Sequence, residues 1–124
     1  MKLIFLNILV FAIFSVGCAM MPPSGYYWGH YSETLYAYKK APSPETLKSH
    51  QKEIEEILSF SKQSNRLPPP GLTAELGQIF LNRGDKVQAV AYFQAEAQHF
   101  PESLLLMQHL IQQVSSTNTE SKPK

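Results

Sequence analysis

The sequence has little of what catalysis or nucleic-acid binding requires. Among its 124 residues there is one cysteine, Cys18, and one tryptophan, Trp28. A single cysteine excludes a disulfide within the chain and leaves one thiol to be explained. The formal net charge is only +1, so the chain lacks the basic surface that binding to nucleic acid needs.

Sequence motifs of enzymes and metal sites are also missing. The sequence contains no GxSxG elbow, no Walker loop and no HExxH or His-x-x-x-His pair. We therefore predict no catalytic residue, no cofactor and no metal. We expect each of the four histidines to lie at or near the surface: His30, His50, His99 and His109.

The only long apolar run is residues 3–16, in which Asn7 and Ser15 are the only polar side chains. This run is shorter than the roughly 20 residues that a membrane-spanning helix needs. It follows Lys2 and ends in small residues, the pattern of a secretory signal peptide. The alternative is a buried N-terminal helix, which would need a polar face that this run lacks.

The end of the run, Ser15-Val16-Gly17-Cys18, resembles the lipobox of bacterial lipoproteins. The resemblance implies that residues 1–17 are removed and that Cys18 is acylated, although Ser15 stands where leucine is usual. Ala19, rather than aspartate, implies the outer membrane, with the domain facing the periplasm. A free or intermolecularly paired thiol is the alternative interpretation of Cys18.

Cleavage before Cys18 would leave a chain without net charge, because it removes Lys2, one of 11 Lys and Arg residues, and none of the 10 Asp and Glu residues. No polybasic cluster suits anionic lipids, so acyl chains would supply the membrane affinity, at about 0.8 kcal/mol per buried methylene. We assign residues 18–25 to a tether, 26–114 to a helical domain and 115–124 to a disordered polar tail.

Helical periodicity and capping residues predict the elements of this domain. A short helix begins at Ser32, and a second runs from Ser43 to about Ser64, with an apolar face that includes Leu47, Ile54, Ile57, Leu58 and Ser61. Residues 65–70, with three prolines, form an extended connector. Three more helices follow over residues 71–83, 86–100 and 102–114. Gly84 suits a left-handed turn between the first two, and Asp85 caps the next helix in a capping box completed by Gln88. Val87 and Phe93 are among the apolar residues of that helix.

Part of the second half, residues 70–103, resembles a tetratricopeptide repeat. Leu76, Gly77, Phe80, Ala89, Phe93 and Pro101 fall at its spacing, whereas Thr73 and Glu96 depart from it. We expect Gly77 and Ala89 to allow close helix approach and Glu96 to face inward, where it would need a partner. The predicted fold class is all-α: helical hairpins stacked as one tetratricopeptide-like repeat, a degenerate repeat over residues 32–64 and a C-terminal capping helix.

The whole mature sequence also resembles a small family of tetratricopeptide-like lipoproteins of Gram-negative bacteria, whose function is unknown. The resemblance rests on YYWGHYSETLYAYKK, from Tyr26, and on PPPGLTAELGQIFLNRGDKVQAVAYFQAEAQHFPES, from Pro68. Genes of that family typically lie beside two other lipoproteins, one of them similar to the curli secretion channel. The resemblance therefore implies protein partners, namely other outer-membrane lipoproteins and a curli-channel-like pore.

Four aromatic rings stand together just after the tether: Tyr26, Tyr27, Trp28 and Tyr31. Three interpretations remain open for them. The rings cover the core of the first hairpin, rest among lipid headgroups, or bind a partner as hot spots.

The last helix is apolar over more of its circumference than a capping helix needs, and Leu106 and Leu110 are its candidate partner-binding residues. The alternative is that this helix belongs to the core and is covered by the rest of the chain. The predicted function is a non-enzymatic, lipid-anchored adaptor in an outer-membrane assembly or secretion complex. The alternative is an accessory protein that binds peptidoglycan or envelope glycan through its Tyr and Trp side chains.

Overall fold

The computed structural model describes residues 25–116, and this part of the chain is all-α, with no strand. The helices are α2 (Tyr31–Lys40), α3 (Pro44–Gln63), α4 (Leu72–Asn82), α5 (Lys86–His99) and α6 (Leu104–Ser116), with a 3-10 turn, η1 (Pro101–Ser103), before α6. The predicted signal peptide, Cys18, most of the tether and the tail beyond Ser116 lie outside the described residues.

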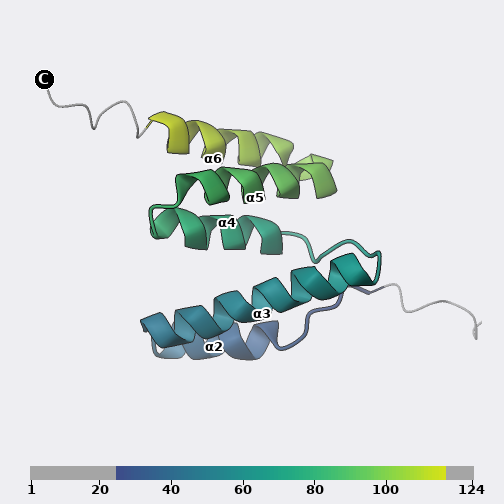
Figure 1. Ribbon diagram of the computed structural model, residues 1–124, viewed down its shortest axis with the longest axis vertical. Coiled ribbons are helices and arrows are strands. Elements are labelled where there is room, and N and C mark those ends of the chain that lie inside the picture. Colours follow the sequence, from purple (N-terminus) through teal and green to yellow (C-terminus); the bar gives the residue numbers. More distant parts are fainter. Residues whose placement is uncertain (1–24, 117–124) are drawn as a thin grey trace, which may run out of the picture.

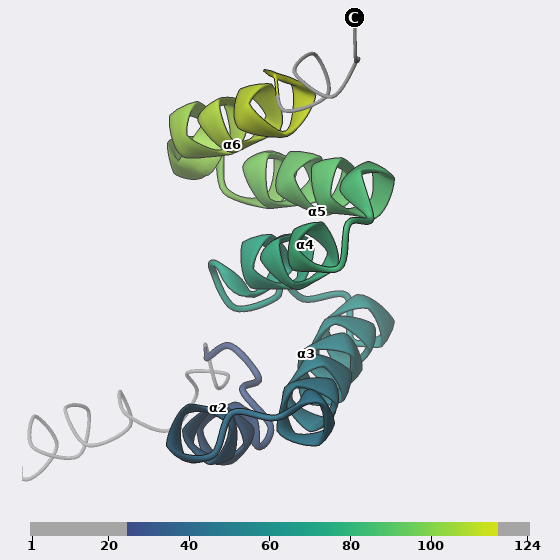
Figure 2. The ribbon, with the colours of Figure 1, turned by 90° about the vertical axis from the view of Figure 1, so that its left-hand side faces the viewer.

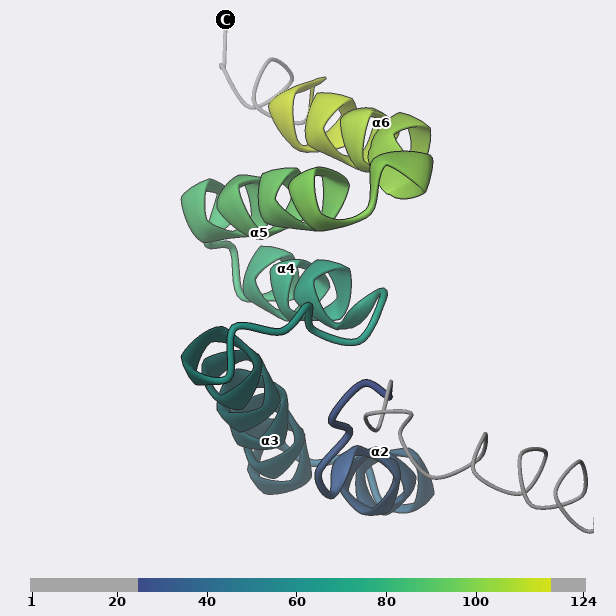
Figure 3. The same ribbon diagram turned by 90° about the vertical axis from the view of Figure 1, so that its right-hand side faces the viewer.

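The helices stack in chain order, and successive helices run in opposite directions (Figure 1). The views from the two sides of Figure 1 show α2 and α3 at one end, α6 at the other, and α4 with α5 between them (Figures 2 and 3). The predicted all-α stack of helical hairpins is therefore confirmed. No helix between residues 25 and 116 is long and apolar enough to cross a membrane.

The helix boundaries follow local capping chemistry. Ser43 and Thr46 cap α3 reciprocally, each side chain bonding the other's backbone N–H. The Asp85 carboxylate accepts a hydrogen bond from the backbone N–H of Gln88 at 3.0 Å. The predicted capping box also needs the Gln88 side chain to accept the backbone N–H of Asp85. That bond does not form, because the Asp85 N–H donates to the Phe80 carbonyl instead. The last helix begins at Leu104 rather than residue 102, because Pro101 opens a 3-10 turn, and it continues to Ser116, past the predicted boundary of the tail.

Two adjoining clusters of buried side chains form the core. The first joins α3 to α4 through Ile54, Ile57, Leu72, Leu76 and Ile79, and the second joins α5 to α6 through Ala89, Phe93, Met107 and Val114. The apolar face predicted for α3 is therefore correct, with Leu47 and Leu58 packed at its margin. Val87 does not belong to the apolar face of α5, because its side chain is largely exposed.

Helices α4 and α5 approach closely at Gly77. A Cβ atom there would lie 2.8 Å from Cε1 of Phe93 and 3.2 Å from the backbone oxygen of Ala89. Both distances are shorter than van der Waals contact, so this crossing excludes any larger residue unless the neighbours move. The expected close approach at Gly77 and Ala89 is confirmed.

Glu96 faces inward, as predicted, and its partner is the start of another helix. Its Oε1 accepts a hydrogen bond from the N–H of Gly71 at 2.7 Å, and Gly71 is the residue that precedes α4. A carboxylate there satisfies a free N–H and complements the positive end of the α4 dipole. Glu96 therefore caps α4 from α5 and fixes the end of the proline connector.

Candidate functional site

The aromatic segment after the tether packs along the stack and remains partly open to solvent. The ring of Tyr27 lies on Phe60 of α3, with centroids 4.1 Å apart, and the ring of Tyr26 meets Phe100 edge-on at 6.4 Å. Trp28 lies 5.4 Å from the ring of Tyr31. Because Tyr26, Tyr27 and Trp28 are each 41–44% exposed, they contact the stack and still present ring surface to a ligand or partner.

A turn at Gly29 fixes the segment before α2 begins. Gly29 has φ of +47°, a left-handed conformation, and a Cβ atom there would collide with the Glu53 carboxylate. That carboxylate accepts the backbone N–H of His30 at 2.7 Å. The left-handed backbone and the contact with Glu53 together require glycine at position 29. The turn places the Trp28 ring close to the start of α2.

A polar network joins the first hairpin to α4. The carboxylate of Glu75 accepts the Tyr31 hydroxyl at 2.8 Å and lies 3.0 Å from Nε2 of His50, whose Nδ1 lies 2.9 Å from Oγ1 of Thr34. Burial, followed by the hydrogen bond and the negative charge of Glu75, raises the pKa of Tyr31 to about 12. Tyr31 therefore stays protonated and donates to Glu75 at neutral pH.

The order Thr34, His50 and Glu75 is that of a nucleophile, a base and an orienting acid. However, His50 is only 1% exposed, and the Thr34 hydroxyl also lies within hydrogen-bond distance of two carbonyls of its own chain, those of His30 and Tyr31. We assign this network to docking of the two hairpins. The expectation that every histidine lies near the surface was wrong for His50, because that residue occupies the apolar face of α3 and has polar partners there.

The first turn of the terminal helix α6 exposes three consecutive leucines. Leu104 is 43% exposed, Leu105 is 81% exposed and Leu106 is 59% exposed. Leu110, by contrast, packs against the cluster of Ala89, Phe93, Met107 and Val114. The structure therefore places Leu106 on the surface and Leu110 at the margin of the core.

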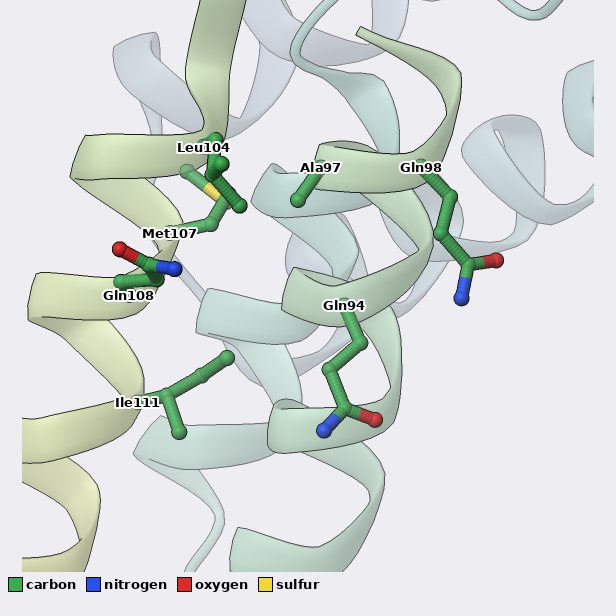
Figure 4. Close-up of a pocket in the computed structure, with 7 residues that line it drawn as sticks. All are labelled: Gln94, Ala97, Gln98, Leu104, Met107, Gln108 and Ile111. Atoms are coloured by element: carbon green, nitrogen blue, oxygen red, sulfur yellow. The ribbon is translucent and has the colours of Figure 1, made fainter. Parts of the chain in front are cut away.

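A shallow groove of about 490 Å³ runs between α5 and α6 beside these leucines. Figure 4 shows apolar side chains from both helices along it, with glutamine amides at its margin. The lining residues are Gln94, Ala97, Gln98, Leu104, Met107, Gln108 and Ile111. Because none of these side chains is charged, the groove suits an apolar segment flanked by uncharged polar groups.

The aromatic segment extends along the stack. Its Tyr27 and Trp28 rings contact Phe60 of α3 and Tyr31 of α2, whereas Tyr26 reaches Phe100 at the end of α5; α6 lies at the opposite end of the stack from α2 (Figure 2). Among residues 25–116 there is no cluster of three His, Cys, Asp or Glu side chains arranged to hold a metal ion.

Comparison with known proteins gives a family. The model described as "Domain of unknown function (DUF4810)" matches residues 26–110. The chain belongs to this family. No curated protein and no solved structure matches it. The DUF4810 match begins at the first ring of the aromatic segment and ends at Leu110 within α6, so both candidate surfaces lie largely within the DUF4810 domain.

Proposed function

We propose that this DUF4810 protein is a non-enzymatic adaptor, anchored by lipid at Cys18, that docks another protein of the bacterial outer membrane onto α6. The observation that carries the proposal is the row of exposed leucines on the terminal helix, Leu104, Leu105 and Leu106. A terminal helix whose only task is to close a stack has a polar outer face. The three leucines exposed in the first turn of α6 depart from that pattern and fit an apolar contact with a partner helix, whereas the later exposed residues of α6 are polar.

The free energy available from burying these leucines supports a specific contact. Burying an exposed leucine side chain contributes about 1.5–3 kcal/mol. Leu105 and Leu106 together therefore offer several kilocalories per mole to a partner, before the cost of association is subtracted. The adjoining α5–α6 groove extends this surface without adding charge.

The chemistry of the groove limits the partner. Its margin is formed by three glutamines and its floor by apolar side chains, so a strongly charged helix would lose solvation there without gaining an ion pair. We propose that the occupant is a helix with an apolar stripe flanked by uncharged polar residues, supplied by another outer-membrane lipoprotein. Such helix-in-groove docking depends on anchors at helical spacing.

The proposed anchor would hold the domain close to a membrane. The lipobox resemblance ends at Cys18, and the first described ring is Tyr26. A chain spans at most about 3.3–3.6 Å per residue, so the aromatic segment lies within a few nanometres of the acylated cysteine. A partner anchored in the same membrane therefore meets the domain at a high effective concentration.

The test changes the outer face of α6 and leaves the core alone. We expect Leu105→Gln with Leu106→Gln to remove co-purification of an envelope lipoprotein from detergent-solubilised membranes, with the midpoint of thermal unfolding unchanged. Leu67→Gln is the matched control, because Leu67 is also exposed but lies in the proline connector. Partners are identified by mass spectrometry. Capture that persists in the double variant would refute docking on α6.

One further variant distinguishes the alternative function. If the protein instead binds envelope glycan through its rings, Trp28→Ala should abolish co-purification of cell-wall fragments, and the α6 variant should leave it intact. That result would replace the adaptor proposal.

A further inference from the structure

A second pocket, distinct from the α5–α6 groove, opens between the C-terminal part of α3, the connector and α5. Its volume is about 520 Å³, within the range of pockets that hold small molecules. Figure 1 shows the C-terminal ends of α3 and α5 on the same side of the molecule, with the connector rising between them. Leu58, Pro68, Ala95 and Tyr92 contribute apolar and aromatic surface to its lining.

Thr73 contributes to the lining of the pocket, and its hydroxyl is buried without a hydrogen-bond partner among the described residues. Thr73, the second residue of α4, is 3% exposed, and its Oγ1 makes no hydrogen bond with the described part of the chain. Buried polar groups are almost always paired, because an unpaired one loses its solvation without compensation. Because the oxygen itself is buried, Thr73 shapes the wall of the pocket, and the charged residues of the lining are the groups open to a ligand.

The charged residues of the lining are all basic. Lys62, Arg66 and His99 line the pocket, and no aspartate or glutamate does. Within residues 25–116, the ion pairs are His30–Glu33, His50–Glu75 and Lys52–Glu56, so neither Lys62 nor Arg66 is engaged by a carboxylate. Glu96 does not line the pocket; its Oε1 accepts the N–H of Gly71, and its Oε2 is buried and unpaired in the described part of the chain.

The backbone that carries these cations is held in place. Asn65 has φ of +52° and turns the chain back after α3, and the N–H of Arg66 donates to the Ser61 carbonyl at 2.9 Å. Lys62 lies in the last turn of α3, so both positive charges belong to the same end of the helix. Burial, and secondarily the charge of Glu55, raises the pKa of Tyr92, which keeps the hydroxyl of that wall neutral.

We propose that this pocket binds a carboxylate carried on a small apolar body, in the form of an N-acylated amino acid or the C-terminal residue of a peptide. The carboxylate pairs with Arg66 and Lys62, for which a guanidinium fork and an ammonium are well suited. The apolar side chain rests on Leu58 and Tyr92. This site does not depend on the docking surface of α6.

The test uses two ligands that differ only in the terminal group, a carboxylate in one and a neutral amide in the other. We expect the full-length chain in detergent to bind N-acetyl-leucine with a Kd of about 1 mM, the strength typical of so small a ligand, measured by saturation-transfer NMR. N-acetyl-leucinamide, which lacks the carboxylate, should bind at least about tenfold more weakly, because a charge-assisted bond is lost. Equal binding of acid and amide, or no binding of either, would overturn the proposal.

Variants assign the contacts. Lys62→Gln with Arg66→Gln should weaken binding of the acid about tenfold or more, whereas Lys48→Gln with Lys52→Gln, which removes two charges elsewhere on α3, should leave it unchanged. Thr73→Val should leave binding of the acid unchanged and raise the midpoint of unfolding, because it removes a buried, unpaired hydroxyl. Equal losses in the two charge variants would show non-specific attraction and refute the site.

Two competitors identify the source of the carboxylate. Tighter binding of N-acetyl-Ala-Ala-Leu than of N-acetyl-leucine supports a peptide C-terminus, and equal binding supports a free N-acylated amino acid. Displacement of N-acetyl-leucine by inorganic phosphate at equal concentration would overturn the proposal, because the apolar body would then contribute nothing.

Discussion

Replacing Gly77 by alanine tests the closest contact of the fold, because two effects of known size oppose each other there. In an exposed helix, alanine is favoured over glycine by about 1 kcal/mol. Here the new methyl group would lie 2.8 Å from Cε1 of Phe93 and 3.2 Å from the Ala89 oxygen. Phe93 is fully buried and Ala89 contributes backbone, so neither yields easily, and overpacking of this kind costs about 1–3 kcal/mol.

We therefore expect Gly77→Ala to lower the free energy of unfolding by about 1 kcal/mol. For a domain of this length that corresponds to a fall of about 4–8 °C in the melting midpoint. Urea unfolding followed by far-ultraviolet circular dichroism measures the change, with the m-value as a check that the unfolding transition is otherwise unaltered.

A double-mutant cycle identifies the cause. Phe93→Leu removes the ring atoms that the methyl group would meet, so in that background Gly77→Ala should raise the unfolding free energy by up to about 1 kcal/mol. The reversal of sign is the decisive observation. A stabilising effect of Gly77→Ala in the otherwise unaltered chain would show that α4 and α5 are not packed this closely.

Three further predictions concern charge, capping and processing. The folded-state pKa of Tyr31 is raised from 10.0 to about 12, so its contribution to stability is complete below pH 10 and is lost as the pH rises through 12. Tyr31→Phe should flatten this part of the stability–pH profile, and an unchanged profile would contradict the role of Tyr31. Glu96→Ala should lower the free energy of unfolding by about 1–3 kcal/mol, because the Gly71 N–H loses its charged acceptor. Glu96→Gln keeps an oxygen there and should lower it less. Equal losses of the two variants in urea unfolding would contradict the capping role. Cys18→Ser should abolish fatty-acid labelling and leave an uncleaved precursor, and normal maturation of that variant would refute the lipoprotein proposal.

Local chemistry in the sequence was enough to predict most helices and their caps. Ser43 before Pro44 predicted the start of α3, and Asp85 after Gly84 predicted the start of α5, because a cap depends on residues three or four positions away. His50 was misjudged although the signal was present, since residues 47, 50, 54 and 57 follow helical spacing and place it on the apolar face. The polar side chain of His50 indicated the surface, whereas its position on the helix indicated the core.

The sequence by itself determined the all-α class, the hairpin order and the close approach at Gly77, because each depends on periodicity, capping or the absence of a side chain. Only the tertiary structure decided which distant groups meet. Glu75 joins Tyr31 and His50, Glu96 caps α4, and Lys62 and Arg66 share a pocket with Thr73, which lies on another helix. These contacts depend on how the hairpins pack against each other. Periodicity and capping describe residues a few positions apart, so they do not predict contacts between residues 25 or 44 positions apart.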